Sequence, residues 1–429
     1  MSEREPEKRA RGVWKALQQV AKETVLGIGG LREAVFVPFL AILTALIISG
    51  LFIVISEPVV VNAYANFFQN PGYAFSVTWT TLSSAYGALF RGSIGDPREI
   101  YRALVTFSQV GDVAPLRYAL YPISESLTTS VPYIFAGLAV ALGFRCGLFN
   151  IGAEGQILIG ALASVWVGYA IKGLPWFIHL PLALVAGALG GALWGAFPGW
   201  LKARTGAHEV INTIMMNYLA FRLSDLLLTD PRLMGRPTGT PMTPQISPTA
   251  YLPRLLGSPL RFHAGFFMAL GVAALVYWFL WKTTLGFEIR TVGANPDAAR
   301  YAGMSIARNF VLAMGFSGTL AGLAGANEVL GITHFVGGGF SPGYGFDSIA
   351  LALLGKSHPV GVVLAALLFG TLRAGASKMQ MIGIPIDIIQ ILQAMIIMFI
   401  AAPALVRLIY RLKVEREVTE VVFTRGWGG

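Results

Sequence analysis

Long stretches without Asp, Glu, Lys or Arg alternate with charged segments along the chain. A helix that crosses the hydrocarbon core of a membrane needs about 20 mostly apolar residues. The stretches of suitable length are Ala34–Ser56, Ser126–Phe144, Gly155–Ile171, Gly173–Leu201, Phe262–Trp281, Asn309–Asn327 and Ile388–Val406. Weaker candidates are Val210–Leu228, which contains two charged residues, and Ser357–Leu372. The pattern predicts an all-α polytopic membrane protein with about eight to ten transmembrane helices.

Glycine and proline interrupt this pattern. Val329–Phe346 is uncharged but rich in glycine, and together with Ile349–Gly355 it predicts irregular backbone or a short half-helix. Such a broken or re-entrant segment is tolerated in a membrane only where it is buried in protein or lines a cavity. Residues 230–261 contain seven prolines, which preclude regular structure over most of that segment.

Small residues are concentrated inside the predicted spans. Successive G-x-x-x-G steps are formed by Gly187, Gly191, Gly195 and Gly199, and one more by Gly318 and Gly322. Such steps allow two helix backbones to approach closely. They predict dense helix packing and say little about function.

Lys and Arg are concentrated at both ends of the chain, with seven before residue 34 and five after residue 403. Because cytoplasmic segments of membrane proteins are enriched in Lys and Arg, we expect both termini to be cytoplasmic and the number of spans to be even. The predicted parts are a cytoplasmic N-terminal segment (1–33), a transmembrane domain (34–403) and a cytoplasmic tail (404–429). Within the domain we expect extracytoplasmic loops at 57–125 and 230–261 and a cytoplasmic loop at 282–308.

The N-terminal segment carries apolar residues at helical spacing, namely Val13, Trp14, Leu17, Val20 and Ala21. The Lys and Arg residues around them favour an amphipathic helix that lies on the cytoplasmic membrane surface. The alternative is a solvated helix whose apolar stripe packs on the protein's own loops.

Composition excludes several other classes of protein. Of the 429 residues, 55% are hydrophobic and 13% are charged, which is about half the charged share of a soluble domain. The net charge of +10 does not indicate nucleic-acid binding, because the basic residues lie between apolar runs. The single cysteine, Cys146, excludes an intramolecular disulfide and a multi-thiolate metal site, and a small core residue is its simplest interpretation.

The sequence contains no recognisable catalytic or metal site. Gly355-Lys356-Ser357 resembles the end of a phosphate-binding loop, but Ala350 stands where that loop needs glycine. His208-Glu209 resembles the start of a zinc protease motif, but position 212 is Asn, and no serine lies in a G-x-S-x-G turn. We therefore expect no cofactor in this chain, and any ATP must be used by another chain.

The first informative stretch is Arg145-Cys-Gly-Leu-Phe-Asn-Ile-Gly-Ala-Glu-Gly-Gln156, directly before an apolar run. A carboxylate at membrane depth costs about 2.5–3.5 kcal/mol on insertion scales, so Glu154 is expected to be functional or paired. Asn150 and Glu154 share a face if the segment is helical, whereas its glycines favour a broken helix that lines a cavity. The alternative is a structural network in which these side chains satisfy the broken backbone, with or without Arg145.

The second stretch is Gly286-Phe-Glu-Ile-Arg-Thr-Val-Gly-Ala-Asn-Pro-Asp-Ala-Ala-Arg-Tyr-Ala-Gly303, in the largest predicted cytoplasmic loop. Asn295-Pro296 is a helix start signal. Ala298, Ala299 and Ala302 then predict a short helix with a flat face, which suits docking into a groove of another protein. An idle loop helix is equally compatible with these residues.

The third stretch is Gly343-Tyr-Gly-Phe-Asp-Ser-Ile-Ala-Leu-Ala-Leu-Leu-Gly355, in which Asp347 interrupts an apolar region. Asp347 is either functional or an N-cap that closes a half-helix. Other polar residues in or near the spans, each able to contact solute or to join helices by hydrogen bonds, are Asn212, Asn217, Asn327 and Glu328.

The three stretches resemble those of the permease subunits of bacterial ABC importers for nucleosides and simple sugars, which are related to the ribose and branched-chain amino-acid permeases. The motifs are Gly147-Leu-Phe-Asn-Ile-Gly-Ala-Glu-Gly-Gln156, the Gly293-x-Asn295 loop and Gly343-x-Gly-Phe-x-x-Ile-Ala, and the resemblance covers roughly residues 126–403. The Asn-Ile-Gly-Ala-Glu-Gly-Gln string, the third motif and the long first external loop are most similar to the nucleoside, purine-type branch. The charged N-terminal extension departs from the family.

The resemblance implies a type II ABC importer permease in the bacterial cell membrane. Two permease subunits, often non-identical, form the pathway, two ATPase subunits carry ATP and Mg²⁺, and an extracytoplasmic substrate-binding protein or lipoprotein delivers solute; no nucleic acid takes part. The residues expected along the substrate pathway are Asn150, Glu154, Gln156, Asn212, Asn217, Asn327, Glu328 and Asp347. The residues expected in the loop that couples to the ATPase are Gly293, Asn295, Pro296, Ala298, Ala299 and Gly303.

Other functions stay open on the residues alone. A simple sugar such as ribose could be carried by the same mechanism. An ion-coupled secondary transporter could use membrane carboxylates, namely Glu154, Asp225, Glu328, Asp347 and Asp387. A membrane receptor or scaffold without transport is a third class, and an ATPase encoded beside this gene would favour the importer over both other classes.

Overall fold

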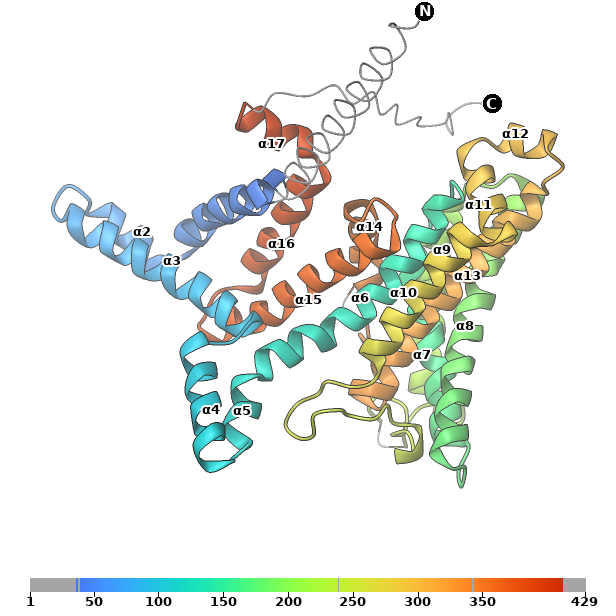
Figure 1. Ribbon diagram of the computed structural model, residues 1–429, viewed down its shortest axis with the longest axis horizontal. Helices are drawn as coiled ribbons and strands as arrows, with labels where there is room; N and C mark the ends of the chain where they lie inside the picture. Colours follow the sequence, from blue (N-terminus) through green and yellow to red (C-terminus); the bar gives the residue numbers. More distant parts are fainter. Residues whose placement is uncertain (1–35, 38, 238, 342, 412–429) are drawn as a thin grey trace, which may run out of the picture. The chain divides into compact units, whose positions relative to one another are not determined.

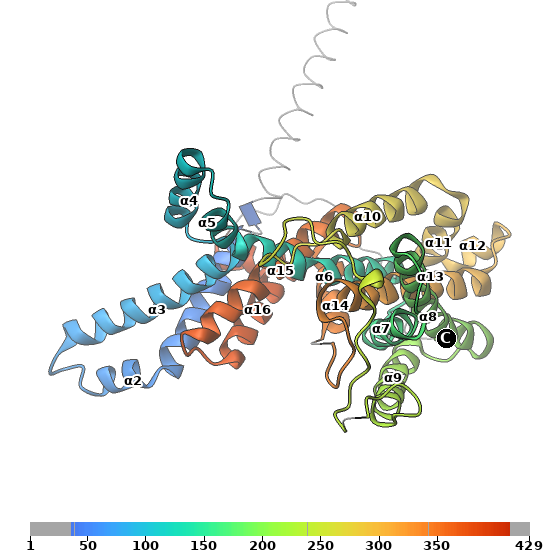
Figure 2. The same ribbon diagram turned by 90° about the horizontal axis from the view of Figure 1, so that it is seen from below.

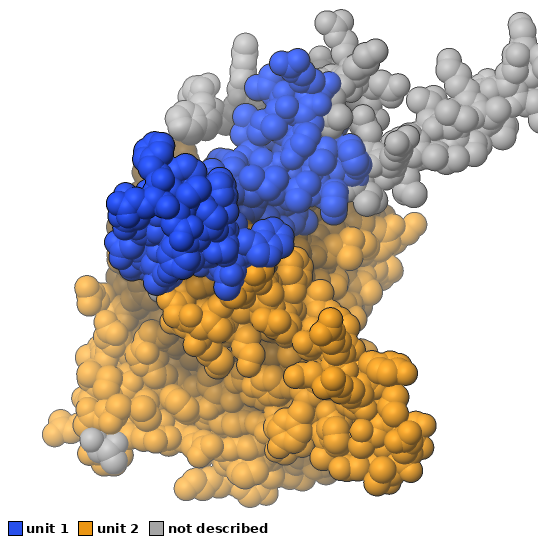
Figure 3. All heavy atoms as spheres, turned by 90° about the vertical axis from the view of Figure 1, so that its left-hand side faces the viewer, with its two compact units in different colours: residues 1–82, 387–419 blue, residues 83–386, 420–429 orange. Residues whose placement is uncertain are grey.

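The computed structural model describes residues 36–37, 39–237, 239–341 and 343–411. Within these ranges the regular elements are helices, with two isolated β-bridges. The chain divides into two compact units, coloured separately in Figure 3: unit 1 is residues 1–82 and 387–419, and unit 2 is residues 83–386 and 420–429. The amphipathic helix predicted within residues 1–33 lies outside the described residues, as does most of the predicted tail.

Unit 1 joins the two ends of the described chain. It contains the apolar helix Phe39–Ser56, α2 (Pro58–Ala65), the first part of α3 (Pro71–Ser93), most of α16 (Ile386–Ala401) and α17 (Pro403–Ile409). Within it the hydroxyl oxygens of Thr44 and Tyr410 lie 3.0 Å apart.

The span predicted over 388–406 is not one straight helix. The helices α16 and α17 meet at an angle of 87°. The break falls at Pro403, because proline has no N–H to donate and its ring disfavours the helical conformation of the preceding residue.

Unit 2 contains the other helices and the three informative stretches. Its elements after α3 are α4 (Pro97–Val110), α5 (Ala114–Ala119), α6 (Tyr121–Arg145), α7 (Ala153–Ala170), α8 (Trp176–Thr205), α9 (Glu209–Thr229), η1 (Pro248–Ala250), α10 (Gly265–Lys282), α11 (Thr284–Ala294), α12 (Pro296–Tyr301), α13 (Ile306–Glu328), η2 (Val329–Thr333), α14 (Tyr344–Leu354) and α15 (Pro359–Met381). The predicted spans coincide with α6, α7, α8, α9, α10, α13 and α15, the last of which continues beyond its predicted end past Arg373 and Lys378.

Six helices in the described part of the chain are long and apolar enough to cross a membrane, or seven if the bent pair α16–α17 is one span. This is fewer than the eight to ten predicted. The helices α7 and α9 are 18 and 21 residues long, but their hydropathy is lowered by polar side chains such as Glu154, Gln156, Arg222 and Asp225. The protein is a multi-pass, all-α membrane protein.

The segment 57–125, predicted as a loop, is mostly helical. The helix α4 begins at a proline after Asp96, whose carboxylate accepts a hydrogen bond from Arg98 N (2.9 Å), and it ends before Gly111 at φ 73°. A search for charge-free runs misses α4, because its charged residues occupy one face of an amphipathic pattern.

The proline-rich segment before α10 is irregular apart from the turn η1, as predicted. It packs as extended chain against the residues that follow α13. Thr243 N donates to Val336 O (2.9 Å), Ile246 N to His334 O (3.0 Å) and Leu252 N to Leu330 O (2.9 Å). Figure 1 shows this segment at the end of the helix bundle opposite α11 and α12.

The helices α8 and α13 run side by side in both ribbon views (Figures 1 and 2). A Cβ added at Gly318 would lie 2.1 Å from Gly191 O, and one at Gly322 would lie 2.2 Å from Gly187 O. The predicted glycine steps therefore form a backbone-to-backbone seam.

The half-helix predicted near residue 350 is present as α14. The helix α13 continues into the π-helical turn η2, which ends at His334 in the left-handed conformation (φ 62°), and irregular chain then leads to α14. The helix α14 itself contacts α6 and α7.

Candidate functional site

The connection between α6 and α7 is a break, and Asn150 lies within it. Residues 146–152 are not helical, so Asn150 and Glu154 do not share a helix face. Asn150 Nδ2 donates to Gln156 Oε1 (3.0 Å) and Ser317 Oγ (2.8 Å), and Asn150 Oδ1 accepts from Gln156 Nε2 (3.2 Å) and Gly152 N (3.0 Å). Asn150 and Gln156 are buried. The Asn150 amide has no hydrogen-bonding capacity left.

Two more buried side chains tie the start of α7 to its neighbours. Asn217 on α9 accepts from Gly155 N (2.8 Å) and donates to Ile151 O (2.9 Å). The Glu154 carboxylate accepts from Gly345 N (2.6 Å), one of the free N–H groups at the start of α14, where a negative charge is favourable. The predicted pathway residues Asn150, Glu154, Gln156 and Asn217 thus lie around the break. Asn150 and Asn217 form hydrogen bonds with its backbone.

Asp347 is held by α6 and is not an N-cap. Gly343 occupies the N-cap position of α14, and Asp347 Oδ2 accepts from Tyr133 Oη (2.9 Å). The ring of Tyr133 also meets Tyr344 edge to face, with centroids 5.0 Å apart. Sequence reasoning missed Tyr133 and Tyr344, because an aromatic residue in an apolar run looks like an ordinary core residue.

Asn327 and Glu328, at the end of α13, differ from the network around Asn150. Three side-chain atoms there are shielded from solvent and have no hydrogen-bond partner among the described residues. They are Nδ2 and Oδ1 of Asn327 and Oε2 of Glu328. Asn327 Oδ1 and His263 Nδ1 lie 2.0 and 2.6 Å from the position that a Cβ on Gly265 would take, and His263 Nε2 is also unpartnered within the described chain. Arg261, which pairs with Glu125, lies within electrostatic range of Glu328.

Asn212 lies apart from the residues around Asn327. It is in the first turns of α9, whereas Asn327 ends α13 at the opposite end of the bundle. Asn212 Nδ2 is shielded and without a partner in the described structure. The structure therefore divides the predicted pathway residues into a network around Asn150, a group around Asn327, and Asn212 by itself.

The predicted loop helix is present as α12, and its start is the expected one. The Asn295 side chain accepts from Asp297 N and Ala298 N, both at 3.0 Å, and Pro296 is the first helical residue. The predicted flat face is partly wrong, because Ala299 is buried. Tyr301, at the end of α12, is 97% exposed, and it was missed because a lone loop tyrosine carries no motif.

Gly293 serves packing, and the exposed surface of the loop lies beyond it. A Cβ at Gly293 would lie 2.2 Å from Arg145 O, and one at Gly147 would lie 3.3 Å from Gly293 Cα. The end of α11 therefore rests with bare backbone on the end of α6. Ala298 and Gly303 are exposed, and Gly303 adopts φ 81° directly after the helix.

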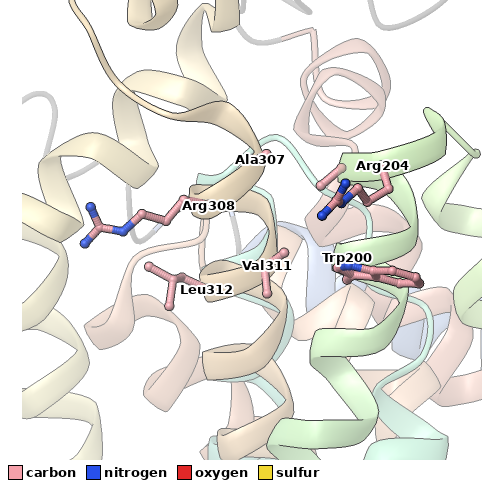
Figure 4. A pocket seen from close by; sticks show the side chains of 7 residues that line it. Trp200, Arg204, Ala307, Arg308, Val311 and Leu312 are labelled. Carbon is pink, nitrogen blue, oxygen red and sulfur yellow. The ribbon is translucent and has the colours of Figure 1, made fainter.

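A groove of about 320 Å³ lies between α8 and α13 (Figure 4), lined by Trp200, Ala203, Arg204, Ala307, Arg308, Val311 and Leu312. None of these residues is a predicted pathway residue, whereas Ala307 and Arg308 belong to the end of the predicted loop 282–308. The groove brings Arg204, in the last turn of α8, close to Arg308, at the start of α13.

Comparison with known proteins decides the family. Residues 123–401 match the model of the branched-chain amino acid transport system permease component. The chain belongs to this permease family. Among curated relatives, the guanosine ABC transporter permease NupP of Bacillus subtilis is 42% identical over 337 residues, which cover 78% of this chain and 89% of NupP.

Other relatives of this permease differ in the solute that they are named for. The glucose ABC transporter permease TsgB13 of Haloferax volcanii is 39% identical (65% of this chain, 76% of TsgB13), and the nucleoside permease NupB of Lactococcus lactis is 38% identical (65% and 79%). A second permease of Bacillus subtilis, the guanosine permease NupQ, is 27% identical to this chain, and a second permease of Lactococcus lactis, the nucleoside permease NupC, is 29% identical. No solved structure matches the chain.

Proposed function

We propose that this chain is the transmembrane subunit of an ATP-driven importer that carries nucleosides, purine nucleosides in particular, into a bacterial cell. The observation that carries the proposal is the similarity to a guanosine permease over 78% of this chain. The membership of the permease family supports a transport component that is not itself the ATPase.

The polar groups of unit 2 support an uncharged solute with many hydrogen-bonding groups. We assign solute contact first to Asn327, which is 1% exposed and whose amide is unpartnered within the described residues, and then to Glu328 and His263 beside it. A solute that reaches Asn327 gains hydrogen bonds without breaking any in the protein, whereas Asn150 would have to give up four. Asn150, Gln156 and Asn217 then hold the α6–α7 break, and Glu154 and Asp347 hold α14 beside the path.

The loop α11–α12 supports coupling to a separate ATPase. In this proposal α12 enters a groove of the ATPase with Tyr301 and Ala298 at the contact, and Asn295 fixes the start of the helix. Both termini and this loop are cytoplasmic, a second and non-identical permease completes the pathway, and an extracytoplasmic binding protein delivers solute. The occurrence of two nucleoside permeases in one organism among the relatives supports the non-identical pair.

A sugar is the second candidate solute, because a glucose permease is 39% identical to this chain. Hydroxyl groups could use the same Asn327 amide. A purine base differs from a sugar in offering a flat aromatic face, which the rings near α14, such as Tyr344, can contact.

The test is uptake by the complete assembly in proteoliposomes, with the binding protein outside and ATP inside. We expect ATP-dependent uptake of labelled guanosine that excess adenosine reduces and excess glucose or ribose does not. If glucose or ribose reduces the uptake and adenosine does not, the solute is a sugar and not a nucleoside. Uptake by this chain alone, without ATP, would refute the importer and favour an ion-coupled carrier. A catalytically inactive ATPase in the same assembly is the control for passive leakage.

A further inference from the structure

Arg145, the last residue of α6, contacts two elements of the loop region through its guanidinium. Its Nε donates to Ser357 O (2.9 Å) and its Nη2 to Lys356 O (3.1 Å), in the turn between α14 and α15. The guanidinium carbon also lies 5.2 Å from the centre of the Trp281 ring at the end of α10. Within the described residues no carboxylate forms an ion pair with Arg145.

The turn that Arg145 holds is strained. Lys356 and Ser357 both adopt left-handed backbone, with φ of 51° and 49°. Such conformations are costly for residues other than glycine and persist only where the surroundings enforce them. The two carbonyls lie in sequence, and the planar fork of an arginine can donate to both at once, which a lysine ammonium cannot do with the same geometry.

The other side of Arg145 meets the loop α11–α12. Its carbonyl oxygen lies 2.2 Å from the position of a Cβ on Gly293, so no side chain separates the two backbones. Arg290 on α11 also lies over Trp281, 5.7 Å from the ring centre, and its Nε donates to Leu280 O (2.8 Å). The loop and Arg145 are therefore fixed against the same tryptophan.

The other end of α14 is tied to α6 and α7. Gly345 N donates to Glu154, and Asp347 accepts from Tyr133. A displacement of the turn at Lys356 and Ser357 must therefore move α14 against α6 and α7 or break these bonds.

We propose that Arg145 is the positioning residue that transmits movement of the loop α11–α12 to the half-helix α14. This inference rests on the proposed function, because it assumes that an ATPase moves the loop. When the loop shifts, the rigid contact between Gly293 and Arg145 moves the end of α6, and the arginine fork moves the strained turn and α14 with it. Hydrogen bonds to neutral carbonyls, without an opposing charge, allow the turn to exchange between two positions.

The first experiment is hydrogen exchange of residues 352–358 in the full assembly, with and without ATP and vanadate. The amides of Lys356, Ser357 and His358 are bonded to carbonyls of the α14 end, so they report opening of the turn. We expect their exchange in the wild type to change with nucleotide. In Arg145→Lys we expect exchange about tenfold faster in both states and no response to nucleotide, because the loss of one charge-assisted hydrogen bond corresponds to roughly a tenfold change.

The second readout separates transmission from folding. In Arg145→Lys we expect assembly and basal ATP hydrolysis within about twofold of the wild type, and about tenfold less solute carried per ATP. Arg204→Lys, an exposed arginine in the last turn of α8, is the matched control and should change neither. If Arg145→Lys prevents assembly, or leaves transport per ATP unchanged, the proposal is wrong.

The two proposals fail in different ways. If wild-type assembly carries no nucleoside but the turn still responds to nucleotide through Arg145, the choice of solute is wrong and the transmission stands. If nucleoside uptake is ATP-dependent and the turn never responds in the wild type, the importer stands and the role of Arg145 is refuted.

Discussion

Replacement of Gly318 with alanine tests the seam between α8 and α13. The added Cβ would lie 2.1 Å from Gly191 O and 2.9 Å from Gly191 C, where ordinary contacts begin at 3.4 Å. Both atoms are backbone, so no side chain can turn away and the helices must separate by roughly 1 Å. Gly315 on the same helix is the matched control, because its Cβ would find its nearest atoms at 3.6 and 3.9 Å.

The magnitudes of two opposing effects decide the outcome. Alanine in place of glycine within a helix is worth up to about 1 kcal/mol, and overpacking costs about 1–3 kcal/mol or more. Separation at Gly318 also loosens the neighbouring contact of Gly322 with Gly187. We expect Gly318→Ala to lose about 2 kcal/mol, and Gly315→Ala to lose nothing or to gain up to about 1 kcal/mol.

The single cysteine provides the assay. Cys146 is 1% exposed, and burial raises the pKa of its thiol to about 12, so it should react with a thiol-specific fluorophore only when the protein unfolds. Heating the purified chain in detergent with such a dye gives its apparent Tm, which should fall by several degrees in Gly318→Ala and not in Gly315→Ala. If Gly318→Ala has the Tm of the wild type, or if Gly315→Ala lowers the Tm as much as Gly318→Ala, the close contact between α8 and α13 at Gly318 is refuted.

Three further predictions concern polar and aromatic side chains. Tyr301→Ala should weaken binding of the ATPase about 30-fold in a pull-down titration, since an interface aromatic is worth about 2 kcal/mol. Tyr118, which is 68% exposed on α5, is the control, and Tyr118→Ala should leave binding unchanged. Equal effects of the two substitutions would contradict the docking role. Asn327→Ala should keep the wild-type Tm and raise the KM for uptake about fivefold, and an unchanged KM removes it from the pathway. Tyr133→Phe should lower the Tm in the thiol assay, because Asp347 loses a hydrogen bond worth about 1–3 kcal/mol; an unchanged Tm argues against that bond.

The helices of the permease core could be predicted because apolar length alone specifies them. The predicted spans Ser126–Phe144 and Asn309–Asn327 lie inside α6 and α13. The helices α3 and α4 could not be found in that way, because polar residues interrupt their apolar runs. The bend at Pro403 is a signal that the sequence does contain, since proline in an apolar run predicts a break.

The candidate site was predicted unevenly, because a sequence shows which groups are polar but not which are already bonded. The cap at Asn295 depends on neighbours two and three residues away, so local spacing reveals it. The burial of Ala299, and the lack of a hydrogen-bond partner for the Asn327 amide among the described residues, depend on distant segments. No local pattern distinguishes Asn327 from Asn150, although only Asn150 has every hydrogen bond made.

The three motifs of the sequence meet around one break, and this changes the meaning of each. Gly147 of the first motif touches Gly293 of the second, and Glu154 of the first binds Gly345 of the third. A Cβ at Gly345 would lie 2.2 Å from Glu154 N, as close as one at Gly293 would lie to its neighbour on α6. In both places glycine is required because two backbones touch. The first motif therefore does not act only as a pathway, the second only as a docking loop, or the third only as a helix cap. A change in any one motif moves the backbone of another.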